Sequence, residues 1–566
     1  MSDINIISLG GVRENGKDMY LAEIDEAIYI LDCGLVYPPD EMLGIDVMIP
    51  EFDYLLKNKD RLAGVFLTHG HPDAAGALPY LLQEVDLPVF GSEMTLELVK
   101  LQAQDMGVKL NTRDFHKVTD EHKIEFSDVT VSFFNTTHSV PGSMGIVLKT
   151  DQGNIVYTGD FKFDATVSEA YRTNYEELMN VASEGVLALL SESNKAESIV
   201  DNASEATIEA ALFHEVRQAK GRVVLSAVSS NIMRLQQIVN VAHQTRRHIF
   251  VADNFASAVI DLAVGLNQLH IPSRRLFQDL KKLAKYPNDE VIILETGRSG
   301  DSLRSLENMA RGRRHPVHIE EGDVVILATT PNADMEKAVA ETKDAIYRAG
   351  GSTIEISSKY HSSGHASPKD LQFLLSLLKP KYFIPVSGEY RLMHEHKKLA
   401  LELGMAPQNI FLLDKGDVLT FGEKKAYIGR QVEADNVLID GSGIGDIGNI
   451  VMRDRQMLSE DGVFVVVLTI SRREKRIMAG PEVISRGFVF MKESRDLLNE
   501  SKDVAIQVVN EHLQSNNFQW SALKAGLREH IGKFLFKATK RRPMILPVVM
   551  EASNYLKHKN RQGRVK

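Results

Sequence analysis

The chain has almost no cysteine and almost no tryptophan. Its 566 residues include one of each, and the single cysteine is Cys33. One cysteine excludes an intramolecular disulfide and any cysteine-rich zinc finger. A metal ion bound by this chain would therefore be held by histidine, aspartate and glutamate.

Long apolar runs and a leader segment are also missing. No run approaches the roughly 20 apolar residues that a membrane-spanning helix requires, and the opening Met-Ser-Asp-Ile has neither the basic nor the apolar region of a signal peptide. With 43% hydrophobic and 25% charged residues, the composition is that of a folded globular protein long enough for two to four domains. These features predict a cytoplasmic protein without membrane contact.

A surplus of positive charge is absent as well. The net charge is −10, which argues against a protein that coats nucleic acid nonspecifically, although a local basic groove can lie within an acidic total. The C-terminal end is an exception, and it forms either a solvated tail or a contact with phosphates or a partner. Its basic residues are Lys537, Lys540, Arg541, Arg542, Lys557, Lys559, Arg561, Arg564 and Lys566.

The clearest functional signal in the sequence is the stretch at residues 65–78. Residues 65–67 are an apolar strand, and Gly70 and Pro72 prevent its regular continuation, so the next side chains lie on a loop at the strand's end. His69 and His71 flank one glycine, and Asp73 adds an oxygen ligand two positions later. This spacing lets side chains converge on one cation, so the stretch predicts a metal-binding loop.

Later strands end in residues of the same chemistry. The strand at residues 129–135 leads to His138, and the one at 155–158 leads to Asp160. Alone, a histidine at a strand end is more often structural, and the carboxylate of Asp32 after the strand 27–31 could simply cap a turn. Several strand ends with metal-binding side chains, in this order, are far more specific than any one of them.

The rest of the chain predicts further domains. From about residue 204, buried strands at 223–225, 248–251, 291–294 and 324–327 alternate with helices, which is typical of a parallel sheet. The word His361-Ser-Ser-Gly-His365 then precedes a helix at 368–378, whose N-terminus is suited to receiving a phosphate. After a glycine-rich hinge at 441–448, strands at 463–468 and 487–490 and a helix at 494–512 predict a small α+β domain.

The motifs resemble those of a known superfamily. Thr-His-Gly-His, Thr-Thr-His-Ser and Tyr-Thr-Gly-Asp-Phe are similar to metallo-β-lactamase motifs, and the inserted α/β region and the 361–365 word resemble the β-CASP nucleic-acid hydrolases. Over nearly its whole length the chain resembles bacterial ribonuclease J. The resemblance implies an α/β fold: a metallo-β-lactamase αββα sandwich at 1–205 and 356–445, a β-CASP α/β domain inserted at 206–355, and a linker with a small C-terminal α+β domain at 446–566.

The resemblance also implies the metal ligands. His69, His71 and His138 would form a first zinc site with Asp160 as a bridging ligand, and Asp73 and Asp160 would serve a second site. Two further histidines of that second site are replaced by Ala74 and Ser387. Two carboxylates alone bind zinc weakly, so we expect at most one tightly bound zinc per chain and a second site that is empty or weak.

The remaining site residues follow from the same resemblance. Glu192 stands where the family has aspartate, and Phe255-Ala256-Ser257 replaces a Gly-Arg-Ser word. We assign catalytic roles to Asp73, which would orient or deprotonate water, to His365, which would stabilise phosphoryl or leaving-group charge, and to Glu192, which would handle protons. Substrate binding falls to Ser230, Asn231, His361, Ser362, Ser363, Gly364 and His365.

The implied function is that of the family's second paralogue. We expect a metal-dependent 5′-to-3′ exoribonuclease in RNA processing and decay, with possible endoribonuclease activity, that is weak alone and supports an active paralogue. Its partners would be single-stranded RNA with a 5′-monophosphate, a second copy or the active paralogue, and other RNA-decay proteins. Two alternatives remain open: an inactive, RNA-binding structural subunit, and a small-molecule hydrolase, which would not explain the inserted domain.

Overall fold

Two compact units make up the computed structural model of the chain. Residues 1–37 and 47–437 form the first, and residues 38–46 and 438–566 form the second. The structure describes residues 2–38, 42–297, 301–313, 316–328, 335–441, 443–444, 448–488, 495–515 and 517–552. Of the basic C-terminal residues, those from Lys557 onward lie outside the described part.

The first unit contains a sandwich of two sheets. One sheet has the strand order β21-β20-β1-β2-β3-β5-β6-β7 and the other β19-β12-β11-β10-β9-β8. The first consists of β1 (Ile4–Gly10), β2 (Met19–Ile24), β3 (Ala27–Leu31), β5 (Leu62–Phe66), β6 (Val89–Gly91), β7 (Phe115–Lys117), β20 (Asp417–Phe421) and β21 (Ala426–Gln431). The second consists of β8 (Lys123–Glu125), β9 (Thr130–Asn135), β10 (Met144–Thr150), β11 (Gly153–Tyr157), β12 (Val186–Glu192) and β19 (Tyr382–Val386).

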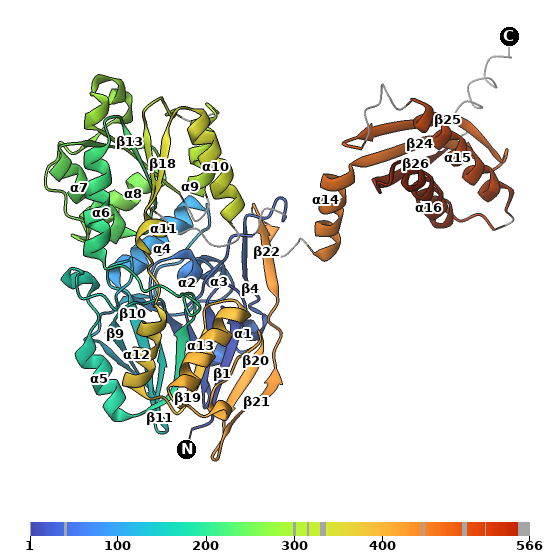
Figure 1. Ribbon diagram of the computed structural model, residues 1–566. Helices are drawn as coiled ribbons and strands as arrows, with labels where there is room; N and C mark the ends of the chain where they lie inside the picture. The colour runs from blue at the N-terminus through green and yellow to red at the C-terminus, as the bar shows by residue number, and fades with distance from the viewer. Residues whose placement is uncertain are drawn as a thin grey trace, which may run out of the picture. The chain divides into compact units, whose positions relative to one another are not determined.

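The two sheets share one core. Tyr29 and Phe66 of the first sheet pack in a single cluster with Phe133 and Ile146 of the second. The outer face of the second sheet is covered by α5 (Tyr175–Glu184), α12 (Pro368–Leu378) and α13 (Tyr390–Glu402), as Figure 1 shows. Helices α1 (Asp53–Lys57), α2 (Pro72–Ala75), α3 (Leu78–Glu84) and α4 (Glu93–Asp105) come from the segments that join strands of the first sheet. This is the predicted αββα sandwich.

An inserted domain interrupts the sandwich between β12 and β19. Its sheet has the order β15-β14-β16-β13-β17-β18, and all neighbours are parallel. The strands are β13 (Val223–Val228), β14 (His248–Val251), β15 (Phe277–Gln278), β16 (Val291–Gly297), β17 (Val324–Leu327) and β18 (Ser352–Glu355). Helices α6 (Glu205–Gln218), α7 (Ile232–Thr245) and α8 (Asn254–Gly265) cover one face, and α9 (Asp301–Ala310) and α10 (Glu336–Arg348) cover the other.

The C-terminal unit is a three-stranded sheet backed by two long helices. It follows a short hairpin of β22 (Asn436–Asp440) and β23 (Gly443–Ile444), and it contains α14 (Asn449–Asp461), β24 (Val463–Ser471), β25 (Arg476–Arg486), α15 (Arg495–Gln514), α16 (Trp520–Thr539) and β26 (Met544–Glu551). The strand predicted at 487–490 is wrong at Gly487 and Phe488, because the chain turns after Arg486 with Gly487 at φ +71. Residues 489–490 lie outside the described part. None of the described helices is long and apolar enough to cross a membrane.

Candidate metal centre

Four strands of the second sheet place candidate site residues at one edge of that sheet. Strands β11, β12 and β19 are mutually parallel, and β9 runs the same way because it and β11 are both antiparallel to β10. Their C-terminal ends therefore share an edge of the sheet. His138 follows β9, Asp160 follows β11, Glu192 is the last residue of β12, and Ser387 follows β19.

The first sheet supplies the loop that carries His69 and His71 after β5. Strand β3, parallel to β5, ends beside it at Asp32. The carboxylate of Asp32 accepts hydrogen bonds from the backbone N–H of Thr68 at 2.7 Å, from the Thr68 hydroxyl at 2.7 Å and from the Tyr157 hydroxyl at 2.8 Å. Asp32 thus fixes the loop by hydrogen bonding and not by ligation, as carboxylates behind metal ligands commonly do.

Hydrogen bonds set the tautomer of each histidine. The Thr68 hydroxyl gives its proton to Asp32, so His69 must donate its Nδ1–H to Thr68 Oγ1 at 2.9 Å. The carbonyl oxygen of Gly364 can only accept, so His138 must donate its Nδ1–H to it at 3.0 Å. His69 and His138 each keep a lone pair on Nε2 for the site.

The third imidazole completes the cluster. His71 Nδ1 lies 3.1 Å from His138 Nε2, and its Nε2 lies 3.2 Å from the Ser139 hydroxyl. The ligand atoms of His69, His71, His138 and Asp160 all lie within 4.8 Å of one another. Three nitrogens and one oxygen at this spacing match the coordination of zinc.

Unpartnered buried atoms show that this donor set fits a cation. Among the described residues, His69 Nε2 and Asp160 Oδ2 have no hydrogen-bond partner, although both side chains are about 98% buried. The two atoms lie 3.6 Å apart, and Asp160 Oδ2 lies 3.9 Å from His138 Nε2. Buried polar atoms without partners are costly, and a shared cation would satisfy both.

The protonation states also suit a metal. Burial, with the charge of His69, lowers the pKa of His71 to about 4, and burial lowers the pKa of His138 well below its usual value. Burial opposes ionisation of Asp160, but the charges of His365, His69 and His71 and a hydrogen bond with His365 together outweigh it and lower the pKa of that carboxyl. At neutral pH, His71 and His138 are therefore neutral and Asp160 is ionised, as metal ligands must be.

At the expected second site, the Ser387 side chain is bound to other protein groups. Ser387, at φ +48, donates its hydroxyl to Asp18 Oδ2 at 3.1 Å, and the Tyr20 hydroxyl lies 3.3 Å from the same Ser387 oxygen. Ala74 is fully buried. Burial, together with the charges of Asp160, Asp73 and Asp32, raises the pKa of Asp18 well above its usual value. This position therefore offers no imidazole.

Asp73 stands apart from the four-ligand cluster. Its Oδ1 lies 3.8 Å from His69 Nε2 and has no hydrogen-bond partner among the described residues. The side chain is 35% exposed, in contrast to Asp160. Asp73 is thus placed at the mouth of the site, where it can reach water.

Glu192 and His365 form a second pair at the same edge. Glu192 Oε1 accepts the backbone N–H groups of Phe161 at 2.9 Å and Ala366 at 3.2 Å, which leaves Oε2 to contact His365 Nδ1 at 2.9 Å. His365 Nδ1 also lies 3.6 Å from Asp160 Oδ2. Burial alone would lower the pKa of His365, but the charges of Glu192 and Asp160 raise it well above its usual value. His365 is therefore a cation beside the metal ligands.

The turn at residues 361–367 faces the cluster through its backbone. Gly364 accepts from His138, and a Cβ atom at this position would approach His138 Cε1 to 3.2 Å, so glycine permits the close contact. Ser363 Oγ accepts the N–H of His365 at 3.1 Å, and Ser362 Oγ accepts from Arg234 at 2.9 Å. His361, by contrast, is exposed at the end of α11 (Ile356–Tyr360).

The helix ends near this turn are already capped. Ser367 and Asp370 form a capping box at the start of α12, so protein groups occupy the N-terminus that we expected to receive a phosphate. Asn231 similarly caps α7 by accepting the Arg234 N–H at 2.8 Å, and Ser230 beside it is buried. The start of α7 still lies at the site, since Met233 N–H donates to the carbonyl of Ser139 at 3.1 Å.

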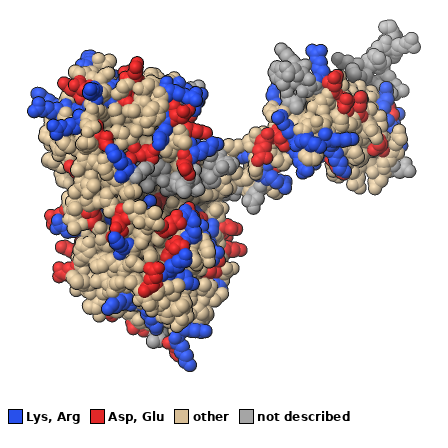
Figure 2. All heavy atoms as spheres, viewed as in Figure 1, with Lys and Arg blue, Asp and Glu red and all other residues tan. Residues whose placement is uncertain are grey.

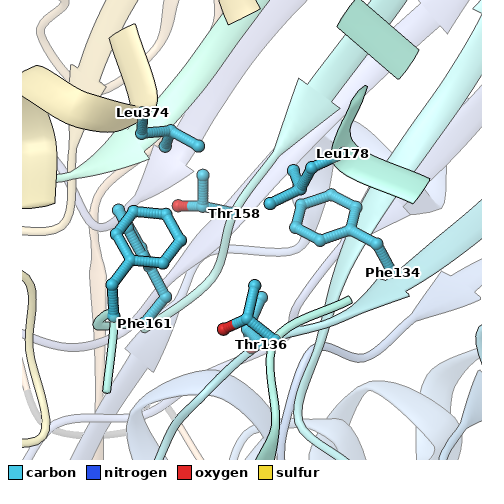
Figure 3. Close-up of a pocket in the computed structure, with 8 residues that line it drawn as sticks. Phe134, Thr136, Thr158, Phe161, Leu178 and Leu374 are labelled. Carbon is cyan, nitrogen blue, oxygen red and sulfur yellow. The ribbon is translucent and has the colours of Figure 1, made fainter. Parts of the chain in front are cut away.

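A small cavity lies on the apolar side of the Asp160 loop. It measures about 10 Å³, room for about one water molecule, and it is lined by Phe134, Thr136, Thr158, Phe161, Phe163, Thr173, Leu178 and Leu374 (Figure 3). Most of its lining is apolar, and no candidate ligand contributes to it. Thr158 and Phe161 flank Gly159 and Asp160, so this cavity belongs to the packing that supports the loop and not to a substrate site.

Several residues of the site have no signal in the sequence. Asp18 and Tyr20 belong to no motif, and only the fold brings them to Ser387. Lys162, two residues beyond Asp160, donates to Glu205 at 2.6 Å and to the carbonyl of Ser363 at 3.1 Å. It therefore connects the loop that carries Asp160 to the inserted domain. Lys162 is only 2% exposed, and lysine is rarely buried unless it is paired, but this burial is visible only in the structure.

Known proteins share this architecture. Four family models match successive segments: the metallo-β-lactamase superfamily at 12–190, the ribonuclease J β-CASP domain at 220–346, a Zn-dependent metallo-hydrolase RNA specificity domain at 354–413, and the ribonuclease J C-terminal domain at 450–552. Ribonuclease J 2 of Streptococcus pyogenes serotype M3 is 48% identical over 551 residues, which cover 97% of this chain and 100% of that protein. This chain belongs to the ribonuclease J family.

Other relatives agree with this membership. Ribonuclease J 2 of Staphylococcus epidermidis and of Staphylococcus aureus are each 42% identical to this ribonuclease J family chain over 549 residues, covering 97% of it and 98% of either relative. A solved protein of unknown function from Enterococcus faecalis V583 matches with a TM-score of 0.52 at 14% identity, over 74% of this chain and 100% of its own, and shows the fold alone. The predicted family, and its metallo-β-lactamase and β-CASP folds, are confirmed.

Proposed function

We propose that this ribonuclease J family chain is a zinc-dependent ribonuclease that removes nucleotides from the 5′-monophosphate end of single-stranded RNA, with one tightly held zinc and weak activity alone. The convergence of ring nitrogens from His69, His71 and His138 with the Asp160 carboxylate, where His69 Nε2 and Asp160 Oδ2 lack hydrogen-bond partners among the described residues, carries the proposal. His69, His71, His138 and Asp160 would hold the metal. Bound zinc supplies a Lewis acid that activates water and offsets phosphoryl charge.

The chain's own groups handle the protons. Glu192 holds His365 Nδ1, so the protonated ring presents Nε2–H to a phosphate oxygen or to the leaving oxygen. Asp73 Oδ1, which has no hydrogen-bond partner among the described atoms and belongs to a side chain that is 35% exposed, accepts a proton from the attacking water. The turn that carries Ser362, Ser363 and Gly364 fixes where the RNA phosphate meets these groups.

The proposal of weak activity rests on the incomplete ligand set of the second site. Without imidazoles at Ala74 and Ser387, a second ion would have Asp73 and Asp160 as its main ligands, and two carboxylates hold zinc poorly. The charge that such an ion would offset in the transition state is then left to His365. The lack of imidazoles at Ala74 and Ser387 also favours the second candidate, an inactive RNA-binding subunit, if one ion and His365 are insufficient for turnover.

We also propose that the C-terminal unit binds a second ribonuclease J chain, either a copy or an active paralogue. Helices α15 and α16 bury one face of its sheet, but the other face exposes Ile484 of β25 and Leu546, Val548 and Met550 of β26. Exposed apolar sheet faces of this kind favour pairing with another protein. Val548→Glu should shift the sedimentation of the full chain toward the monomer, whereas Val549→Thr, on the helix side, should leave assembly unchanged.

A single-turnover assay separates the candidates. With 5′-monophosphorylated RNA, the chain should release nucleotides from the 5′ end, and with 5′-hydroxyl RNA it should be slower. His69→Ala and His365→Ala should each abolish the activity, while His214→Ala, which alters an exposed side chain of α6 outside the cluster and the turn, should retain most of it. If nucleotide release is equally slow in the parent protein and in His69→Ala, the chain is instead the inactive RNA-binding subunit.

A further inference from the structure

The charge of this chain is divided unevenly along its length. Residues 1–446 carry 44 Lys and Arg against 64 Asp and Glu, a net charge of −20. Residues 447–566 carry 22 against 12, a net charge of +10. Such asymmetry between two parts of one chain is typical of a segment that contacts nucleic acid.

Part of that positive charge lies along one face of α16. Leu523, Leu527, Ile531 and Leu535 turn the other face of this helix into the core of the C-terminal unit. Lys533 and Lys537 are exposed at i and i+4 on the outward face, and Lys540, the C-cap residue, is exposed directly beyond the helix. Figure 2 shows basic side chains gathered over the part of this unit where Figure 1 draws α16.

An exposed aromatic ring sits among these cations. Phe536 is 37% exposed, with the Arg542 guanidinium 4.4 Å and the Lys540 ammonium 5.7 Å from its ring centroid. Nearby acids are few: Glu529 pairs with Lys533 at 2.6 Å, and Asp461 accepts the backbone N–H of Arg542 at 2.7 Å. Cations in a last helical turn also offset the helix dipole, but that explains neither an exposed phenylalanine nor Arg542, which lies beyond the helix.

We infer that this basic patch, made of Phe536, Lys537, Lys540 and Arg542, is a binding surface for the backbone of single-stranded RNA, separate from the metal centre. Cations that follow the phosphates and an aromatic ring on which a base stacks are the two components of sequence-independent binding to single strands. The inference rests on the proposed RNA substrate. It assigns the C-terminal unit two opposite faces, a basic one for RNA and an apolar one for another ribonuclease J chain.

The salt dependence of RNA binding tests the patch. The probe is a phosphorothioate-linked single-stranded RNA with a 5′-hydroxyl end, which keeps the backbone charge, resists cleavage and offers no 5′-phosphate. Each phosphate contact to a single strand contributes about 0.7 to the slope of log K against log salt. The full chain with Lys537→Gln, Lys540→Gln and Arg542→Gln should therefore lose about 2 from the magnitude of this slope. Phe536→Ala should weaken binding at least about fivefold while leaving the slope unchanged.

A matched control isolates the position of the charges from their number. Lys109→Gln, Lys424→Gln and Lys425→Gln remove three exposed lysines from the first unit and should leave slope and affinity unchanged. Equal slopes for the two triple variants would overturn the inference, and so would a patch variant that changes only the sedimentation of the chain, because that result identifies a protein interface. If no RNA is cleaved in the activity assay but the slope falls here, the proposed function fails and this surface remains.

Discussion

Two residues are central to the proposed one-zinc centre. Ala74 and Ser387 stand where we expect a second ion to need imidazoles, and the Ser387 hydroxyl is bound to Asp18. Ala74→His with Ser387→His should raise zinc from about one to two per chain, whereas either change alone leaves the coordination shell incomplete and should do little. If the missing ion limits the rate, regaining about 3–4 kcal/mol of transition-state stabilisation should speed cleavage about 10²- to 10³-fold.

Zinc content and exonuclease rate must be measured on one sample of this double variant. Two ions with no gain in rate would show that Glu192, or Phe255 in the inserted domain, misplaces the RNA or the proton-handling groups. Displacing Ser387 also removes the hydroxyl donor of Asp18 Oδ2, so the melting temperature of the metal-free double variant should fall. Ser387→Ala, which loses that same hydrogen bond without adding a ligand, is the control for this effect.

His396 should make stability depend on pH. The ring is fully buried beside Phe383, with Nδ1 3.1 Å from the Ser193 hydroxyl, and burial lowers its pKa to about 3. Because the unfolded state takes up a proton near pH 6.5 and the folded state does not, stability is lost as the pH falls below about 6.5, at about 1.4 kcal/mol per pH unit. Above that pH the group contributes no pH dependence.

Denaturant unfolding of the chain and of His396→Asn, from pH 7 to pH 4, measures this effect. Asparagine keeps an acceptor near the position of Nδ1 but does not titrate in this range. The difference in unfolding free energy between the two proteins should change by about 3 kcal/mol over the series. A constant difference would show that His396 is protonated in the folded state.

At the scale of elements, a buried ion network joins the metal loop to the inserted domain. Lys162, after β11, contacts Glu205 at the start of α6, and Gln237 of α7 donates to Glu205 at 2.8 Å. Arg234 of the same helix lies 3.6 Å from Glu205 and donates to Ser362 in the turn. The network therefore holds α6, α7 and the 361–367 turn against the loop that carries Asp160.

Removing Lys162 should be costly because it leaves Glu205 buried with less compensation. Lys162→Met should lower the free energy of unfolding by about 3 kcal/mol or more. Lys149→Met removes an exposed pair with Glu184 and should cost less than about 1 kcal/mol. Similar losses in the two variants, measured by denaturant titration, would contradict a structural role for the network.

The strand ends could be predicted from the sequence, but the contacts behind them could not. Apolar runs followed by Gly, Pro or Asp located β5, β9 and β11 and their metal-binding residues, because a strand's end is a local property. Asp18 reaches Ser387 and Lys162 reaches Glu205 across more than 40 residues of sequence, so no local pattern reveals these contacts. The sequence analysis also did not predict helix α16 or strand β26. The capped start of α12 depends on the contact between the Ser367 and Asp370 side chains, which the sequence permits but does not require.

At the scale of the whole molecule, the zinc content of the purified chain tests the central claim most directly: that His69, His71, His138 and Asp160 form its one tight metal site. Mass-spectrometric metal analysis after dialysis should find about one zinc per chain, none in His138→Ala, and still about one in Asp73→Ala, since Asp73 lies outside the four-ligand cluster. Two zinc ions held through dialysis, or one that survives the loss of His138, would contradict the account.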